Sequence, residues 1–497
     1  MIRGLAGLLL AAYLLCGGGG ILAAPAAPLE CHIDRISPKS RTLRAACRAE
    51  SRPEKTVLQF TERFAGVEGL SGRNQALKFR DERGEPIMPE ILGEGRYRLR
   101  ARGAFEFSYD VHLARALDPG QHALVSSLGP EAAVLMAGDL LPRLCSEDAE
   151  CDAPAGFLRL RVTPPPEWEL ATIEKEREGV FDLPDPGHAV FFLGRLQRST
   201  IPAVNENGMA VEIAMTGAWG FEPDAIFRLA AAIAREQAAM MGSRESGAFL
   251  VILAPFPQPM TGLRSSGVAI GRTAALMLNP DADPLRTLAH YRNHLAHEML
   301  HFYLPNGFRI RENFDWFWEG FTRYLAVLTL TRLRLLSLRE YLDAIGAEYA
   351  AYAFNPLRAR VSLIDASPEK FTDAANSDLV YRKGMLLAAL YDWELRWQTR
   401  NRSTAADVVG ALYRNYAGGS RPVGNREVLA ALAQPGNFSR LIRDDIQGVA
   451  EIEIEKRLKP YGLLVEWSAA SKWKPRLSPA PKLSDRQREL IDGLGGR

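Results

Sequence analysis

The chain has 497 residues, 47% of them hydrophobic and 24% charged, and its 61 basic and 59 acidic side chains leave a formal net charge of +2. This composition is typical of a folded globular protein and excludes a disordered one. The length is enough for about three domains. A nearly neutral chain without a long basic stripe gives no reason to expect a nucleic-acid partner.

The first residues have the pattern of an export signal. Arg3 precedes the apolar run of residues 5–15, and the small residues of ILAAPAA follow, with cleavage expected near residue 26. The run is too short to span the roughly 30 Å of a membrane core. Cys16 follows a leucine, where lipoprotein signals carry a small residue, and this disfavours a lipid anchor. We therefore expect a periplasmic or secreted protein with no transmembrane span after cleavage.

Four cysteines remain after that cleavage, and all lie in the first third of the chain. Disulfide pairing is the default in an oxidising compartment. Pairing of sequence neighbours predicts the bridges Cys31–Cys47 and Cys145–Cys151. Buried free thiols are the alternative.

The order of the predicted elements indicates an α+β protein with several domains. Short alternating segments separated by Gly and Pro predict strands first, and strands persist to about residue 280. One helix is expected over residues 222–241, and the chain after residue 284 has a helical pattern. The polar end predicts a loosely held tail with a possible short helix. We expect a signal peptide (1–26), a β-rich domain (27–172), a mixed domain (173–400), a helical subdomain (401–466) and a polar tail (467–497).

Residues 297–301 read His-Glu-Met-Leu-His. On a helix, His297 and His301 lie one turn apart on one face, so both imidazoles can reach the same ion. Leu295 and Met299 fall on the opposite, apolar face. Glu298 is turned about 100° away and can reach only a water on that ion, the geometry that makes H-E-x-x-H a zinc peptidase motif. A helix with ordinary surface histidines is the alternative.

Two more histidines, His290 and His294, share the face of the motif. We expect them to be solvated or, at most, to support the ligands.

A catalytic zinc needs a third protein ligand. The metzincin pattern fails, because Leu304 and Gly307 stand where it requires Gly and His. Glu319, in the predicted helix DWFWEGFTRYL, is the expected ligand, since a carboxylate among aromatic residues is costly to bury without a cation. Glu312 and Asp315 are rivals in the expected loop, and an exposed Glu at a helix start is the alternative without a metal.

The strings HEMLH and WEGFTRY resemble the gluzincin zinc peptidases, and most closely the glycyl aminopeptidase family. A third block, SDLVYRKGMLLAALYDWELR, resembles that family's Tyr-x-Lys-Gly helix. The resemblance implies a thermolysin-like catalytic domain over residues 173–400, with a small sheet and a mainly helical lobe. It also implies one Zn²⁺ held by His297, His301 and Glu319, with Glu298 as general base and Tyr381 as a hydrogen-bond donor to the developing oxyanion.

The chain departs from the family at the residues that recognise the substrate. The family carries Gly-Gly-Leu-Glu-His on the strand beside the zinc, whereas this chain has Gly262, Leu263, Arg264 and Ser265. A guanidinium there would repel the free amine of a peptide, so Gly262 and Arg264 predict an altered substrate site. We expect an exported zinc peptidase that acts on peptides or proteins with changed aminopeptidase specificity. A non-catalytic binding or assembly protein on the same scaffold is the alternative.

Overall fold

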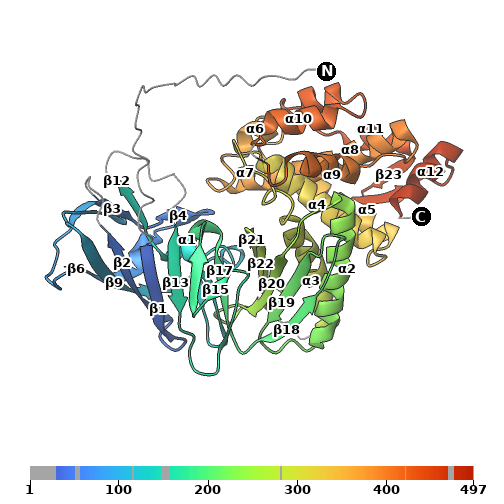
Figure 1. Ribbon diagram of the computed structural model, residues 1–497. Coiled ribbons are helices and arrows are strands. Elements are labelled where there is room, and N and C mark those ends of the chain that lie inside the picture. Colours follow the sequence, from blue (N-terminus) through green and yellow to red (C-terminus); the bar gives the residue numbers. More distant parts are fainter. Residues whose placement is uncertain are drawn as a thin grey trace, which may run out of the picture.

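The computed structural model describes residues 29–50, 56–114, 117–146, 157–279, 283–419, 421–467 and 475–495. The expected signal peptide with Cys16, and Cys151 with its expected bridge to Cys145, lie outside these ranges. The chain runs from a β-rich part, through a second sheet flanked by helices, to a helical part (Figure 1). This order confirms the expected α+β fold.

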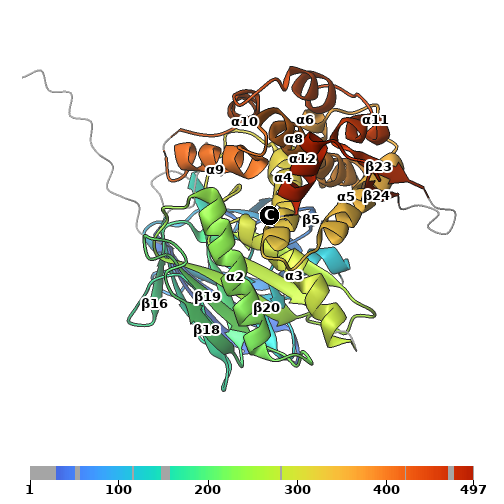
Figure 2. The same cartoon turned by 90° about the vertical axis from the view of Figure 1, so that its right-hand side faces the viewer.

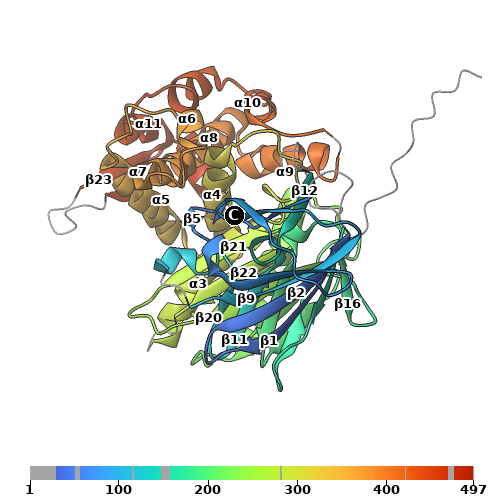
Figure 3. The ribbon, with the colours of Figure 1, turned by 90° about the vertical axis from the view of Figure 1, so that its left-hand side faces the viewer.

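A seven-stranded sheet forms the outer wall of the β-rich part, with the order β15-β16-β13-β1-β2-β9-β6. It faces the viewer in Figure 3. Alternation of buried and exposed residues turns Phe105, Phe107 and Tyr109 of one strand into the core and leaves charged residues outside. The predicted disulfide Cys31–Cys47 joins two neighbouring strands of this sheet. The strands are β1 (Leu29–Ser37), β2 (Thr42–Glu50), β6 (Asn74–Asp81), β9 (Ala104–His112), β13 (Leu158–Val162), β15 (Glu176–Arg177) and β16 (Val180–Leu183).

Two four-stranded sheets complete this part, with orders β12-β3-β8-β7 and β10-β11-β17-β14. Strands β16 and β17 follow residue 172 but pair with strands of the amino-terminal sheets, so the β-rich part extends beyond the expected range 27–172. Strand β17 pairs with the much earlier strand β11, and β16 pairs with β13 across the expected boundary, so local patterns do not show either pairing. The strands are β3 (Thr56–Gln59), β7 (Glu90–Gly93), β8 (Arg96–Leu99), β10 (Ser127–Leu128), β11 (Ala132–Met136), β12 (Arg143–Ser146), β14 (Glu169–Ala171) and β17 (Val190–Gly194), with a separate pair β4 (Arg63–Phe64) and β5 (Val67–Glu68).

A five-stranded sheet, β18-β19-β20-β22-β21, carries the helix of the H-E-x-x-H motif. One face packs against the amino-terminal β structure, and the other is covered by α2 (Pro223–Met241) and α3 (Pro284–Leu300) (Figure 2). The helix predicted over 222–241 is thus confirmed. Strand β21 lies at the edge of the sheet. The strands are β18 (Gln197–Ile201), β19 (Ala210–Met215), β20 (Ala248–Pro255), β21 (Ser265–Ile270) and β22 (Thr273–Leu278).

The remaining helices form one lobe around a common apolar core. Helices α4 and α8 approach closely at two glycines. A Cβ added to Gly320 would lie only 2.4 Å from the backbone of Gly384, so a side chain would not fit there. The elements are α4 (Asp315–Arg332), α5 (Leu338–Ala353), α6 (Leu363–Ala366), α7 (Ala374–Asp378), the π-helical turn η4 (Leu379–Lys383), α8 (Gly384–Thr399), α9 (Ala405–Tyr416), α10 (Asn425–Ala433), η5 (Leu441–Ile446) and α11 (Ile454–Leu458). A short helix α1 (Ala137–Leu140) lies in the β-rich part.

The carboxyl-terminal residues are packed, contrary to the expected loose tail. Strand β24 (Arg476–Pro479) pairs with β23 (Leu463–Glu466), and α12 (Asp485–Leu494) buries Leu490, Ile491 and Leu494 in the helical core. These apolar residues recur at helical spacing and form one apolar face. This face packs against the core although the composition of the segment is polar. Within the described ranges, no helix combines the length and apolar character needed to cross a membrane.

Candidate metal centre

Helix α3 carries both histidines of the motif at its carboxyl end. The Asp283 side chain caps the first turn by accepting hydrogen bonds from the Leu285 and Arg286 backbone N–H groups. Leu295 and Met299 are buried against the sheet, as the helical spacing predicts. His297 and His301 project from the other face, with their Nε2 atoms 3.1 Å apart.

The Glu319 side chain comes from the neighbouring helix α4. Its Oε2 atom lies 3.5 Å from Nε2 of His297 and 3.6 Å from Nε2 of His301. Glu319 is 7% exposed, and its Oε2 accepts no hydrogen bond from any residue in the described ranges. The close contact of Gly320 with α8 holds α4 in this position. The three predicted ligands therefore meet at one point.

The spacing of these three donor atoms suits a zinc ion. Tetrahedral ligands about 2.0–2.1 Å from zinc lie about 3.3–3.4 Å from one another. The separations here run from 3.1 to 3.6 Å, so one ion fits the triangle. His301 supports this interpretation, since its Nδ1 lies 2.7 Å from the Leu304 carbonyl oxygen. Donation from Nδ1 leaves the Nε2 lone pair free to face a metal.

The electrostatics of the triangle favour a cation. Burial raises the pKa of Glu319, but Lys370 and the two imidazoles outweigh this and hold that pKa well below its ordinary value. Burial lowers the pKa of both histidines, yet Glu319 reverses the effect at His301 and raises its pKa to about 9. A buried anion beside two nitrogen donors is the environment that a divalent cation fills.

Glu298 lies beside the triangle and outside it, as predicted. It is 4% exposed, and its Oε1 accepts a hydrogen bond from Nε2 of His294 at 3.1 Å. Burial raises the pKa of Glu298, but His294 and the other imidazoles outweigh this and leave it below its ordinary value. The Glu298 carboxylate is therefore held ionised.

The edge strand β21 lies against this pair. A Cβ on Gly267 would stand 2.5 Å from Nε2 of His294 and 2.6 Å from Oε1 of Glu298. Only a residue without a side chain leaves room for both groups. Two residues earlier, Ser265 Oγ lies 2.7 Å from Nε2 of His290. Both histidines are half-buried beside the strand and hydrogen-bonded, so they are not fully solvated, and neither belongs to the ligand triangle, as expected.

Tyr381 belongs to the π-helical turn η4, a distortion that is frequent at functional sites. Burial and then the Glu319 carboxylate raise the pKa of its hydroxyl, and Glu298 acts in the same direction. The hydroxyl of the tyrosine therefore remains protonated.

The two rival carboxylates are not part of the triangle. Glu312 accepts a hydrogen bond from the Asn425 backbone N–H at 2.8 Å. Asp315 forms an ion pair with Lys370, whose Nζ lies 2.6 Å from Oδ2. Lys370 also donates to Oε1 of Glu319 at 2.9 Å. This lysine was not predicted from the sequence, because it carries no motif of its own.

The predicted substrate residues Gly262 and Arg264 lie just before the edge strand β21. The Gly262 and Arg264 carbonyl oxygens accept hydrogen bonds from Asn279, at 2.6 and 3.0 Å. The Arg264 side chain is exposed and makes no ion pair with the part of the chain that is described. Neither residue touches the triangle.

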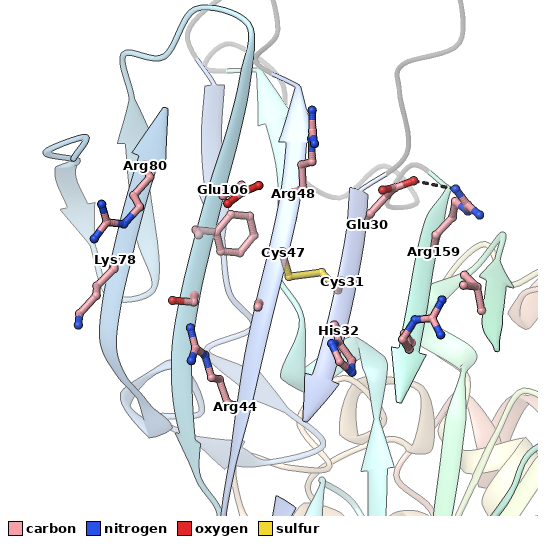
Figure 4. A pocket seen from close by; sticks show the side chains of 15 residues that line it. Glu30, Cys31, His32, Arg44, Cys47, Arg48, Lys78, Arg80, Glu106 and Arg159 are labelled. Atoms are coloured by element: carbon pink, nitrogen blue, oxygen red, sulfur yellow. Dashed lines mark hydrogen bonds and ion pairs between the residues drawn. A yellow bond between two sulfur atoms is a disulfide. The ribbon is translucent and has the colours of Figure 1, made fainter. Parts of the chain in front are cut away.

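A separate hollow of about 730 Å³ lies on the outer face of the seven-stranded sheet (Figure 4). Six cationic side chains and two carboxylates line it, and none of the triangle residues reaches it. The outward-facing Asp34, Glu50, Asp110 and Asp182 on the same strands balance these cations. Charge therefore does not single out an anionic partner for this face.

Comparison with known proteins relates the chain to zinc peptidases. Residues 309–387 match the family model described as M61 glycyl aminopeptidase, a segment that includes Glu319 and Tyr381 but not the two histidines. No curated protein is significantly similar in sequence to this chain.

Solved structures share the fold at low sequence identity. An aminopeptidase N family protein from Idiomarina loihiensis has a TM-score of 0.75 at 17% identity, covering 88% of this chain and 79% of that one. An M1 zinc metallopeptidase from Deinococcus radiodurans has a TM-score of 0.51 at 14% identity, covering 82% and 90%. The predicted resemblance to gluzincin peptidases is confirmed.

Proposed function

We propose that this chain is an exported zinc-dependent peptidase. The observation that carries the proposal is the convergence of His297, His301 and Glu319 on one point, with 3.1–3.6 Å between donor atoms and Glu298 next to it. A zinc held by these three residues would have one position left for water. Bound zinc supplies Lewis acidity and lowers the pKa of that water from 15.7 to about 7.

We assign the steps of peptide hydrolysis to the residues around this centre. Glu298 accepts the proton of the attacking water and passes it to the leaving amine. A buried carboxylate that is held ionised suits this role. The protonated hydroxyl of Tyr381 donates a hydrogen bond to the carbonyl oxygen as negative charge develops, a contribution typically of about 3–4 kcal/mol. The edge strand β21 offers backbone groups to an extended substrate.

We further propose that this chain recognises its substrate differently from a glycyl aminopeptidase. Arg264 and Ser265 stand where the resemblance places Glu and His. Ser265 forms a hydrogen bond with His290. A guanidinium favours an acidic group of the substrate over an ammonium. Replacement of Arg264 by Glu tests this, since the preference for acidic over basic peptides should fall. An unchanged preference would remove the proposal about Arg264 and leave the peptidase.

Export rests on the predicted signal peptide at residues 1–26 and on the Cys31–Cys47 disulfide. Disulfides persist in oxidising compartments such as the periplasm or the extracellular space. Detection of a mature amino terminus near residue 27 in the exported fraction checks this part of the proposal.

A second candidate is a binding or assembly protein that keeps zinc for structure. The altered residues at positions 264 and 265 favour it, whereas Glu298 argues against it, because a structural zinc needs no base. Zinc content and cleavage of a mixed peptide library separate the two, with Glu298→Ala as control. Cleavage that is lost in Glu298→Ala supports the peptidase, and zinc without cleavage in either protein supports the scaffold.

A further inference from the structure

Lys370 binds the oxygen of Glu319 that does not face the histidines. Its Nζ lies 2.9 Å from Oε1, while Oε2 is 3.5–3.6 Å from the two Nε2 atoms. The same ammonium lies 2.6 Å from Oδ2 of Asp315, one helical turn before Glu319. One cation therefore clamps two carboxylates of α4.

The Lys370 side chain is buried and held in place by neighbouring residues. Lys370 is 6% exposed, and its Nζ lies 4.5 Å from the ring centre of Phe371 and 5.6 Å from that of Tyr381. The turn that carries it is fixed to the start of α4, because Ser367 Oγ accepts a hydrogen bond from the Trp316 backbone N–H at 2.9 Å. The lysine is therefore built into the site.

We propose that Lys370 is a positioning residue that keeps Glu319 turned with a single oxygen toward the metal position. This inference rests on the proposed zinc site. A carboxylate with both oxygens free can rotate or bind with both, whereas one oxygen held by an ammonium leaves only the other for the ion. Groups that orient metal ligands in this way are worth about 10–100-fold in metal affinity.

Charge alone makes the opposite prediction, and this makes the inference testable. A cation beside the site repels a divalent ion, so a lysine without a positioning role would weaken zinc binding, and its removal would tighten it. If Lys370 orients Glu319, its removal loosens zinc despite the gain in negative charge. The direction of the change therefore separates the two interpretations.

The experiment measures the zinc dissociation constant of the full chain by competition with a chelator of known affinity. Lys370→Met is compared with the wild type, and Lys383→Met is the matched control. Lys383 is another buried lysine of the helical lobe, but its amine has no hydrogen-bond partner among the described residues and so binds none of the three ligands. The visible absorption of bound Co²⁺ reports on ligand geometry in the same proteins.

We expect Lys370→Met to weaken zinc binding by about 10–100-fold and to change the Co²⁺ spectrum. Lys383→Met should leave both unchanged, and Lys370→Arg should restore part of the affinity. Zinc binding by Lys370→Met that is as tight as wild type, or tighter, overturns the inference while the proposed function stands. A wild type that binds no zinc overturns both. If Lys370→Met does not fold, Lys370→Gln, too short to reach Glu319, carries the same expectation and the same contradicting result.

Discussion

The Nε2 atom of His294 lies 3.1 Å from Oε1 of Glu298, and both groups lie so close to Gly267 that a side chain there would clash with them. This contact turns a histidine of the helix α3 face into a support for the proposed general base. It depends on the edge strand having no side chain at that point.

Replacement of His294 by Ala should lower kcat by about 10–100-fold, because a hydrogen bond to a charged group contributes about 1.5–3 kcal/mol. Zinc content should change little, since His294 is hydrogen-bonded to Glu298 and is not one of the three ligands. His290→Ala is the matched control, because His290 is on the same face but binds Ser265. A His294→Ala protein with wild-type kcat would show that the contact has no catalytic role.

Replacement of Gly267 by Ala should reduce peptide cleavage by about 100-fold, the scale expected when reacting groups are misplaced by about 1 Å. The added methyl would lie 2.5–2.6 Å from His294 and Glu298, so one of them must move. Gly120→Ala is the control, because it adjoins the other side of β21 and a Cβ there meets nothing within 4 Å. Equal activity of Gly267→Ala and wild type would contradict the close packing of β21 against these two side chains.

The sequence predicted the metal triangle because its geometry is mostly local. His297 and His301 are one helical turn apart, and Glu319 follows on the next helix within a recognisable string. Lys370 could not be predicted, since it lies 51 residues from Glu319 in a turn without a motif. The contacts of His290 and His294 were missed for a similar reason. Helical spacing placed them on the right face but does not show that β21 covers that face.

The sequence correctly predicted the elements that are defined by local periodicity, such as the helices α2 and α3. The fold departed from the prediction where pairing is not local: β17 pairs with the much earlier strand β11, and β16 pairs with β13 across the expected domain boundary. The short carboxyl-terminal helix α12 was expected, but its packing against the helical core was not. Its composition is polar, but three apolar residues at helical spacing are enough to anchor it.

Lys383→Met should stabilise the fold below about pH 8. Burial lowers the pKa of this amine from 10.5 to about 8, so the folded state disfavours the charged form. Since the unfolded state binds more protons between these values, wild-type stability rises with pH across that window. The variant lacks this rise and should be more stable by up to about 3 kcal/mol below pH 8. Denaturant unfolding between pH 7 and about 10.5 measures the difference, and parallel curves for the two proteins would contradict the assignment.

Replacement of Cys31 and Cys47 by Ser should destabilise the β-rich part. The bridge closes a loop with a sequence separation of 16, and a loop of that size is worth about 3 kcal/mol. Zinc content should not change, because the bridge lies between β1 and β2 of the outer sheet, whereas the triangle belongs to α3 and α4. Thermal unfolding of the two proteins, without and with a reductant, provides the measurement. A wild type as stable in reductant as without it, with its thiols shown to be free, would count against this role.

The central claim is that His297, His301 and Glu319 hold a zinc ion. It is tested most directly by the zinc bound per chain in purified wild type and in Glu319→Ala, measured by elemental analysis after removal of loosely bound metal. We predict one zinc per wild-type chain and a large loss in Glu319→Ala. A wild type that retains no zinc after incubation with excess metal, or a Glu319→Ala protein that binds it as tightly, would contradict the account.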